Sequence, residues 1–127
     1  MTILGIDWGE AKLGLALSAG KLAEPYEVIR YSDIKILKET LAEIIKRENV
    51  EKIVVGVSEG KSEETARDFG KKIGDLGVEV VYFDETLSTL DARELSRQAG
   101  IGRKKRKALE DSFAASVMLQ SFLDSYV

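Results

Sequence analysis

The first 18 residues, MTILGIDWGEAKLGLALS (Met1–Ser18), contain two short apolar segments separated by a turn. Residues 2–7 and 12–18 are rich in Ile and Leu, which favours β-strands, and Gly9 stands between them. A connection this short favours antiparallel pairing of the two strands. Asp7 ends the first strand, where an aspartate could be a turn residue, part of a phosphate-binding loop or the first ligand of a metal site.

The rest of the chain alternates between strand and helix patterns. A third strand is predicted before the spacing of apolar residues changes from that of strands to that of helices, and later Gly and Asn residues end the predicted helices. Strands are expected at 26–31, 52–57 and 78–83, and helices at 33–49, 62–77, about 88–99 and from about 109 to the C-terminus. Three antiparallel strands followed by two helix–strand units predict an α/β fold.

This order of elements is that of the ribonuclease H-like fold. It predicts a mixed five-stranded sheet, in which three antiparallel strands are extended by parallel additions and helices cover both faces. A chain of 127 residues is expected to form a single domain, 1–127.

Two residue types are missing from the sequence, and their absence excludes several chemistries. The chain has no cysteine and no histidine. Thiol nucleophiles, Cys- or His-ligated metals and the Ser-His-Asp triad are therefore ruled out. Carboxylates with a hard divalent cation such as Mg²⁺ or Mn²⁺ are the chemistry that fits best. No secretory signal and no apolar run of the ~20 residues that span a bilayer occurs, so a cytoplasmic location is expected.

Positive charge is concentrated near the C-terminal third of the chain. Arg103, Lys104, Lys105, Arg106 and Lys107 are consecutive, and the remaining sequence has 14 basic and 22 acidic residues, a net charge of −8. A solvated surface loop is the commonest role of such a run. Nucleic-acid binding is the functional alternative, in which these side chains neutralise backbone phosphates without reading sequence. Trp8 could likewise stack on a base or belong to the core.

Three carboxylates fall where distant segments are expected to meet. Asp7 ends the first strand, Glu85 (or Asp84) follows the fifth, and Asp111 lies in the first turn predicted for the last helix. Taken singly, these residues could be a turn residue, a solvated strand end and a partner of the helix dipole. Together they predict a metal site at one end of the sheet, able to hydrolyse a phosphodiester with one or two divalent cations.

Three motifs resemble those of the YqgF family of Holliday-junction-resolvase-like proteins, also described as nucleases that process the 5′ end of pre-16S ribosomal RNA. The family patterns G-x-D-x-G-x-K-R-I-G-V-A, D-E-R-L-S-T and K-x-R-K…D-x-x-A-A-x-x-I-L-Q-x-F-L are matched in order and across nearly the whole chain. The matching segments are GIDWGEAKLGLALS (5–18), FDETLST (83–89) and KKRKALEDSFAASVMLQSFL (104–123).

The resemblance implies a ribonuclease H-like fold, Mg²⁺ or Mn²⁺, and a nucleic-acid substrate, either pre-16S rRNA or branched DNA. It implies that Asp7, Glu85 and Asp111 are the catalytic and metal-binding triad. Lys12 and Thr89 fall on motif positions expected to touch backbone phosphate. Ribosomal particles are a further expected partner, and the oligomeric state, monomer or weak homodimer, stays open.

The sequence departs from the family pattern at three places. Ala11 stands where the family usually has Lys, and Thr86 replaces the Arg of D-E-R. The segment GVSEG (56–60) lacks the usual proline after its first glycine. Two cationic positions are thereby lost, so we expect altered affinity for the substrate.

Processing of the 5′ end of pre-16S rRNA is the first choice of function, and resolution of Holliday junctions is the alternative. A non-catalytic nucleic-acid-binding ribonuclease H-like module is a second alternative, although such a module would gain nothing from three crowded carboxylates. ATP binding in the manner of the actin and sugar-kinase group needs two such domains, and this chain supplies one.

Overall fold

The computed structural model describes residues 1–8, 12–57, 61–84 and 103–125, and its sheet has the predicted mixed topology. The strand order is β3-β2-β1-β4-β5, in which β1–β2 and β2–β3 are antiparallel and β1–β4 and β4–β5 are parallel. The strands are β1 Thr2–Trp8, β2 Lys12–Ser18, β3 Ala23–Arg30, β4 Val50–Val57 and β5 Glu79–Asp84. The helices are α1 Ile34–Glu48, α2 Lys61–Lys72, the 3₁₀ turn η1 Gly74–Leu76 and α4 Arg103–Ser125.

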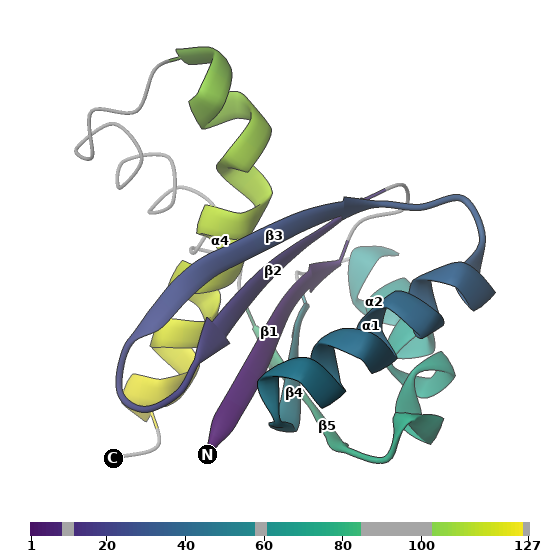
Figure 1. The fold of residues 1–127 in the computed structure, drawn as a ribbon. Coiled ribbons are helices and arrows are strands. Elements are labelled where there is room, and N and C mark those ends of the chain that lie inside the picture. The colour runs from purple at the N-terminus through teal and green to yellow at the C-terminus, as the bar shows by residue number, and fades with distance from the viewer. Residues whose placement is uncertain (9–11, 58–60, 85–102, 126–127) are drawn as a thin grey trace.

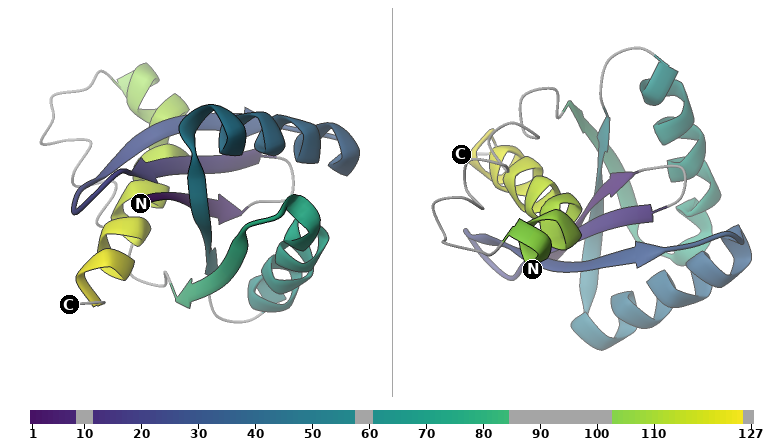
Figure 2. Two further views of the ribbon diagram at one scale, coloured as in Figure 1. Left: turned by 60° about the horizontal axis from the view of Figure 1, so that its bottom comes forward. Right: turned by 90° about the horizontal axis from the view of Figure 1, so that it is seen from above.

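Helices cover both faces of the sheet, as predicted from the element order. In Figure 1, α1 and α2 lie on one side of the strands and α4 lies on the other. The two views of Figure 2 show the same separation into three layers. The helix predicted at about 88–99 lies outside the described residues.

Strand pleating sends alternate side chains of β1 into two separate cores. Leu4 and Ile6 belong to the core under α1 and α2, whereas Ile3 belongs to the core under α4. Gly5 also lies on the α4 face, where an added Cβ would lie 3.0 Å from the Leu119 Cβ. Because side chains alternate along a strand, Asp7 shares the α4 face with Ile3 and Gly5.

Local signals set the limits of α1. The Asp33 carboxylate accepts a hydrogen bond from the Lys35 backbone N–H at 2.8 Å, which caps the first turn. Leu37, Leu41 and Ile44 are buried on the face that packs on the sheet. Asn49 ends the helix in the left-handed conformation with φ 54°.

Candidate active site

Asp7 occupies the last-but-one position of β1, at the carboxyl end of the central strand. Its register partners are Gly14 on β2 and Gly56 on β4, so neither neighbouring strand presents a side chain beside the half-buried carboxylate. In both pairings, partners directly opposite each other share a face of the sheet. On the α4 face, the strand positions on either side of Asp7 therefore carry no side chain.

Helix α4 crosses β1 next to this position. Leu119 of α4 packs against Gly5 of β1, and Gly5 lies two residues before Asp7 on that strand. The next residue of α4 contacts the β2–β3 hairpin: the Gln120 side chain accepts a hydrogen bond from the Ala23 backbone N–H at 2.9 Å and donates to the Lys21 carbonyl at 2.9 Å. These contacts fix the C-terminal half of α4 to the β2–β3 hairpin.

Asp111 lies in α4, but the prediction that it lies in the first turn was wrong. The helix begins at Arg103, which places Asp111 in the third turn, one turn before the buried Ala115 and two turns before the buried Met118. Complementing the helix dipole therefore does not explain this residue, because that effect is confined to the first turn.

The third predicted ligand follows β5. This strand ends at Asp84, one residue before Glu85, which lies outside the described residues. In the β4–β5 register, Phe83 pairs with Gly56 and Asp84 pairs with Val57. Phe83 packs in the core under α4, whereas Val57 belongs to the opposite core.

The described side chains hold one member of the predicted triad, Asp7. Accordingly, no group of three metal-ligating side chains occurs among them. The donor types nevertheless suit a hard divalent cation, because carboxylate oxygens are the ligands that Mg²⁺ and Mn²⁺ prefer. Gly14 and Gly56 add no side-chain donor beside Asp7, so any further protein ligands to such an ion would come from other segments.

The predicted nucleic-acid-binding residues fall into three groups. Lys12 begins β2 and is half-buried, and Thr89 lies outside the described residues. The prediction that the last helix begins at about residue 109 was wrong, because Arg103–Lys107 form the first turns of α4 and not a loop. Lys and Arg have good helix propensity, so a charged run without apolar periodicity still forms a helix here. In Figure 1 these turns extend past β3, away from the rest of the sheet.

A cavity on the opposite face was not foreseen from the sequence. It has a volume of about 360 Å³ and lies between α2 and the segment that joins β3 to α1. Its lining includes Trp8, Tyr31, Thr65, Phe69 and Lys72. The sequence features that could have indicated the cavity are Trp8 and the pair Phe69 and Lys72 on one predicted helix. That Trp8 lies beside this helix depends on the tertiary fold.

Within the described ranges, no helix is both long and apolar enough to cross a lipid bilayer.

Comparison with known proteins gives consistent matches over almost the whole chain. The family model described as "RuvX: Holliday junction resolvase" matches residues 1–125. A relative from Bacillus mycoides, named "Putative pre-16S rRNA nuclease", is 39% identical over 98% of this chain and 99% of its own. A relative of the same name from Streptococcus uberis is 40% identical over 98% of each chain.

Solved structures with the same fold are more distant in sequence. The Thermus thermophilus RuvC in complex with a Holliday junction substrate gives a TM-score of 0.65 at 18% identity, covering 100% of this chain and 97% of its own. The fowlpox virus Holliday junction resolvase gives 0.63 at 12% identity, covering 100% of both chains. These likenesses confirm the predicted ribonuclease H-like fold.

Proposed function

The chain belongs to the RuvX family of phosphodiester-hydrolysing nucleases, and from this premise we propose that it is a divalent-metal-dependent enzyme whose substrate is the 5′ leader of pre-16S rRNA. The observation that carries the metal-dependent mechanism is the position of Asp7. Asp7 is the last-but-one residue of the central strand and lies on the α4 face, with a glycine paired to it on each neighbouring strand. Asp111 belongs to α4, the helix that packs on this face of the sheet.

Asp7, Glu85 and Asp111 are proposed to hold one or two Mg²⁺ or Mn²⁺ ions. When bound, the cation supplies Lewis-acid activation of water and stabilisation of charge on the leaving oxygen of the phosphodiester. The role of the chain is to hold hard oxygen donors at fixed positions on β1, after β5 and on α4. With no histidine in the sequence, no imidazole serves as general base.

The register of β5 favours Glu85 over Asp84 as the second carboxylate. Asp84 pairs with Val57, a residue of the α1–α2 face, whereas Phe83 lies on the α4 face with Asp7. The motif resemblance likewise assigns the second carboxylate to Glu85, the residue after the described end of β5. Glu85→Gln is therefore expected to abolish cleavage, and Asp84→Asn to reduce it far less.

The basic turns of α4 are proposed to hold the nucleic-acid backbone. Arg103–Lys107 precede Asp111 on the same helix, so phosphates bound by the first turns would run toward the carboxylates. Lys12 and Thr89 are proposed to contact backbone phosphate as well. Such contacts release counterions, and binding is expected to weaken as the salt concentration rises.

The names of the sequence relatives favour pre-16S rRNA as the substrate. The alternative is a four-way DNA junction, which is favoured by the description of the family and by the Holliday junction bound to the Thermus RuvC. Paired cuts across a junction require two active sites and therefore a homodimer. A single cut in a leader RNA requires one active site, which a monomer supplies.

The experiment measures Mn²⁺-dependent cleavage of a pre-16S 5′-leader RNA and a four-way DNA junction side by side. Wild type is expected to cut the leader RNA faster, and Asp7→Asn to lose roughly a hundredfold or more of the rate, because metal activation is worth several kcal/mol. Glu43→Gln, an exposed carboxylate on α1, is the matched control.

Two results would contradict the proposal. Preferential cleavage of the junction would replace RNA processing with resolution as the function. Cleavage by Asp7→Asn at the wild-type rate would show that Asp7 is not a ligand of the catalytic metal.

A further inference from the structure

The cavity on the α1–α2 face has aromatic walls and a buried polar atom. Trp8 and Phe69 lie with ring centroids 6.2 Å apart at an interplanar angle of 38°, and Tyr31 and Ile34 add further apolar surface. The Trp8 Nε1–H is buried and has no hydrogen-bond partner among the described residues. A buried donor without an acceptor destabilises the protein, and a ligand that supplies the acceptor would remove this penalty.

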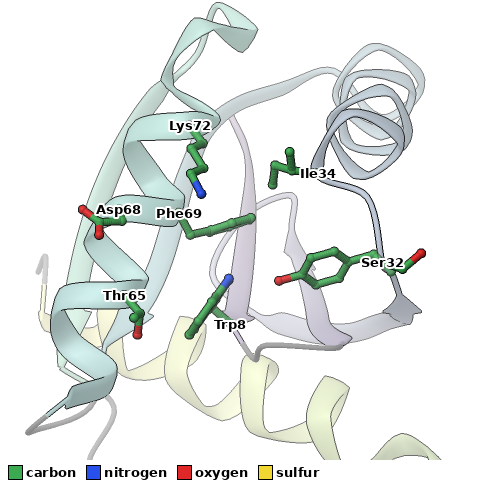
Figure 3. Close-up of a pocket in the computed structure, with 8 residues that line it drawn as sticks. Trp8, Ser32, Ile34, Thr65, Asp68, Phe69 and Lys72 are labelled. Carbon is green, nitrogen blue, oxygen red and sulfur yellow. The ribbon is translucent and has the colours of Figure 1, made fainter.

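A positive charge stands at the same cavity. The Lys72 ammonium belongs to α2, and no ion pair joins it to the part of the chain that the structure describes. Figure 3 shows the Lys72 ammonium and the Trp8 indole nitrogen directed toward the space beside Phe69, whereas the Asp68 carboxylate points away from Trp8. One ligand in that space would therefore meet an aromatic wall, a hydrogen-bond donor and a cation.

These features together select the ligand class. A simple anion would leave the aromatic surfaces unused, and a hydrocarbon would leave the indole N–H unpaired. A planar heteroaromatic ring with an acceptor nitrogen or oxygen and an attached phosphate satisfies all three. The volume of about 360 Å³ falls in the range of small-ligand pockets, ~300–1,000 Å³.

We propose that the cavity lined by Trp8, Phe69 and Lys72 binds a nucleotide. The ring packs against Trp8 and Phe69, a ring acceptor receives the Trp8 Nε1–H, and the phosphate pairs with the Lys72 ammonium. The nucleotide has two possible sources: a free mononucleotide, or an unpaired nucleotide of a bound strand. Trp8 directly follows Asp7 but lies on the opposite face, so the proposal does not depend on the nuclease activity.

The single tryptophan gives a direct readout. The ¹H–¹⁵N correlation spectrum of the metal-free protein contains one indole cross-peak, which is followed during titration with AMP, GMP, CMP and UMP. At least one nucleotide is expected to shift this peak saturably downfield. Inorganic phosphate and ribose 5-phosphate should leave it in place, and the matching nucleoside should bind roughly tenfold more weakly because it lacks the charged contact.

Paired lysine variants test the phosphate contact. Lys72→Gln is expected to weaken nucleotide binding roughly tenfold and to leave nucleoside binding unchanged. Lys71→Gln removes the same charge one residue away, from a position that does not line the cavity, and should have no effect. Trp8→Phe, followed by calorimetry, keeps an aromatic ring but removes the donor and should also weaken binding.

A hexameric single-stranded RNA distinguishes the two sources. Tighter binding of the RNA than of any mononucleotide, with the same dependence on Lys72, assigns the pocket to a strand; the reverse order assigns it to a free nucleotide. Asp7→Asn should retain the indole shift, which separates this site from the proposed active site. An unmoved indole peak with every nucleotide and the RNA, or equal effects of Lys72→Gln and Lys71→Gln, would overturn the proposal.

Discussion

The contact between Gly5 and α4 predicts that Gly5→Ala destabilises the protein. A Cβ at position 5 would lie 3.0 Å from the Leu119 Cβ, 3.3 Å from its Cδ2 and 3.4 Å from its Cγ. The nearest of these atoms belongs to the base of the side chain, so a change of rotamer cannot move it. The new methyl group can be accommodated only by moving α4 away from β1.

Two opposing effects set the magnitude. Overpacking a buried contact costs about 1–3 kcal/mol, whereas replacing a strand glycine by alanine returns about 0.5–1 kcal/mol of backbone entropy. The crowding outweighs the entropy because Gly5 is buried and Leu119 is 0% exposed. We therefore expect a net loss of about 1–2 kcal/mol in the free energy of unfolding.

Urea denaturation measures this loss directly. The midpoint of Gly5→Ala should fall by about 0.5–1 M with an unchanged slope. Gly74→Ala is the matched control, because an added Cβ there meets no atom within 4 Å. That variant should be as stable as wild type or slightly more so. Equal or greater stability of Gly5→Ala would refute the close approach of α4 to β1 at Gly5.

Three further predictions concern the connections between elements. Asp33→Ala removes the acceptor for the Lys35 N–H and should cost about 1 kcal/mol in urea unfolding, whereas Asp33→Ser should restore most of it. Gly77→Ala places a side chain at φ 86° and should cost about 1–2 kcal/mol by the same measurement; wild-type stability would contradict a left-handed residue here. The Lys38 ammonium, hydrogen-bonded to Asp75, lowers the pKa of that carboxyl below its ordinary 3.8. The pair therefore stabilises the fold at neutral pH, and its contribution is lost as the pH falls through the lowered pKa, so Asp75→Asn should destabilise at pH 7 but not at pH 2. Equal effects at both pH values would exclude this ion pair as the cause.

The sheet could be predicted from the sequence because each strand has a strong local pattern. The strand predicted at 12–18 matches β2, whose residues Leu13–Ala16 are all buried because the strand lies between β1 and β3. The continuous apolar run of β4 reflects burial on both faces. The short connections of the first three strands correctly indicated antiparallel pairing.

Element boundaries were harder to predict where tertiary context overrides local signals. β3 begins at Ala23 rather than at residue 26 and includes Pro25, which the sequence pattern places in the preceding turn. Proline is tolerated because β3 is an edge strand, where an N–H can face solvent. The β2–β3 register shifts between Leu15 and Ala16, and Ala16 pairs with this proline. Such irregularities are common at the edges of sheets.

The candidate site was predicted in part. Asp7 could be identified because the end of β1 is marked by the sequence alone, and its position on the α4 face follows from simple alternation. The start of α4 was misplaced because Arg103–Lys107 lack apolar periodicity. The Trp8 cavity could not be predicted, because it forms only where α2 and the β3–α1 connection meet beside β1, and no local sequence pattern indicates that meeting.

The most direct test of the proposed active site is calorimetric titration of the protein with Mn²⁺, without any substrate. Wild type and the control Glu43→Gln should bind the ion with equal affinity, whereas Asp7→Asn, Glu85→Gln and Asp111→Asn should each bind it at least roughly tenfold more weakly. Metal binding unaffected by all three substitutions, or absent from wild type, would contradict a carboxylate metal centre at the end of β1.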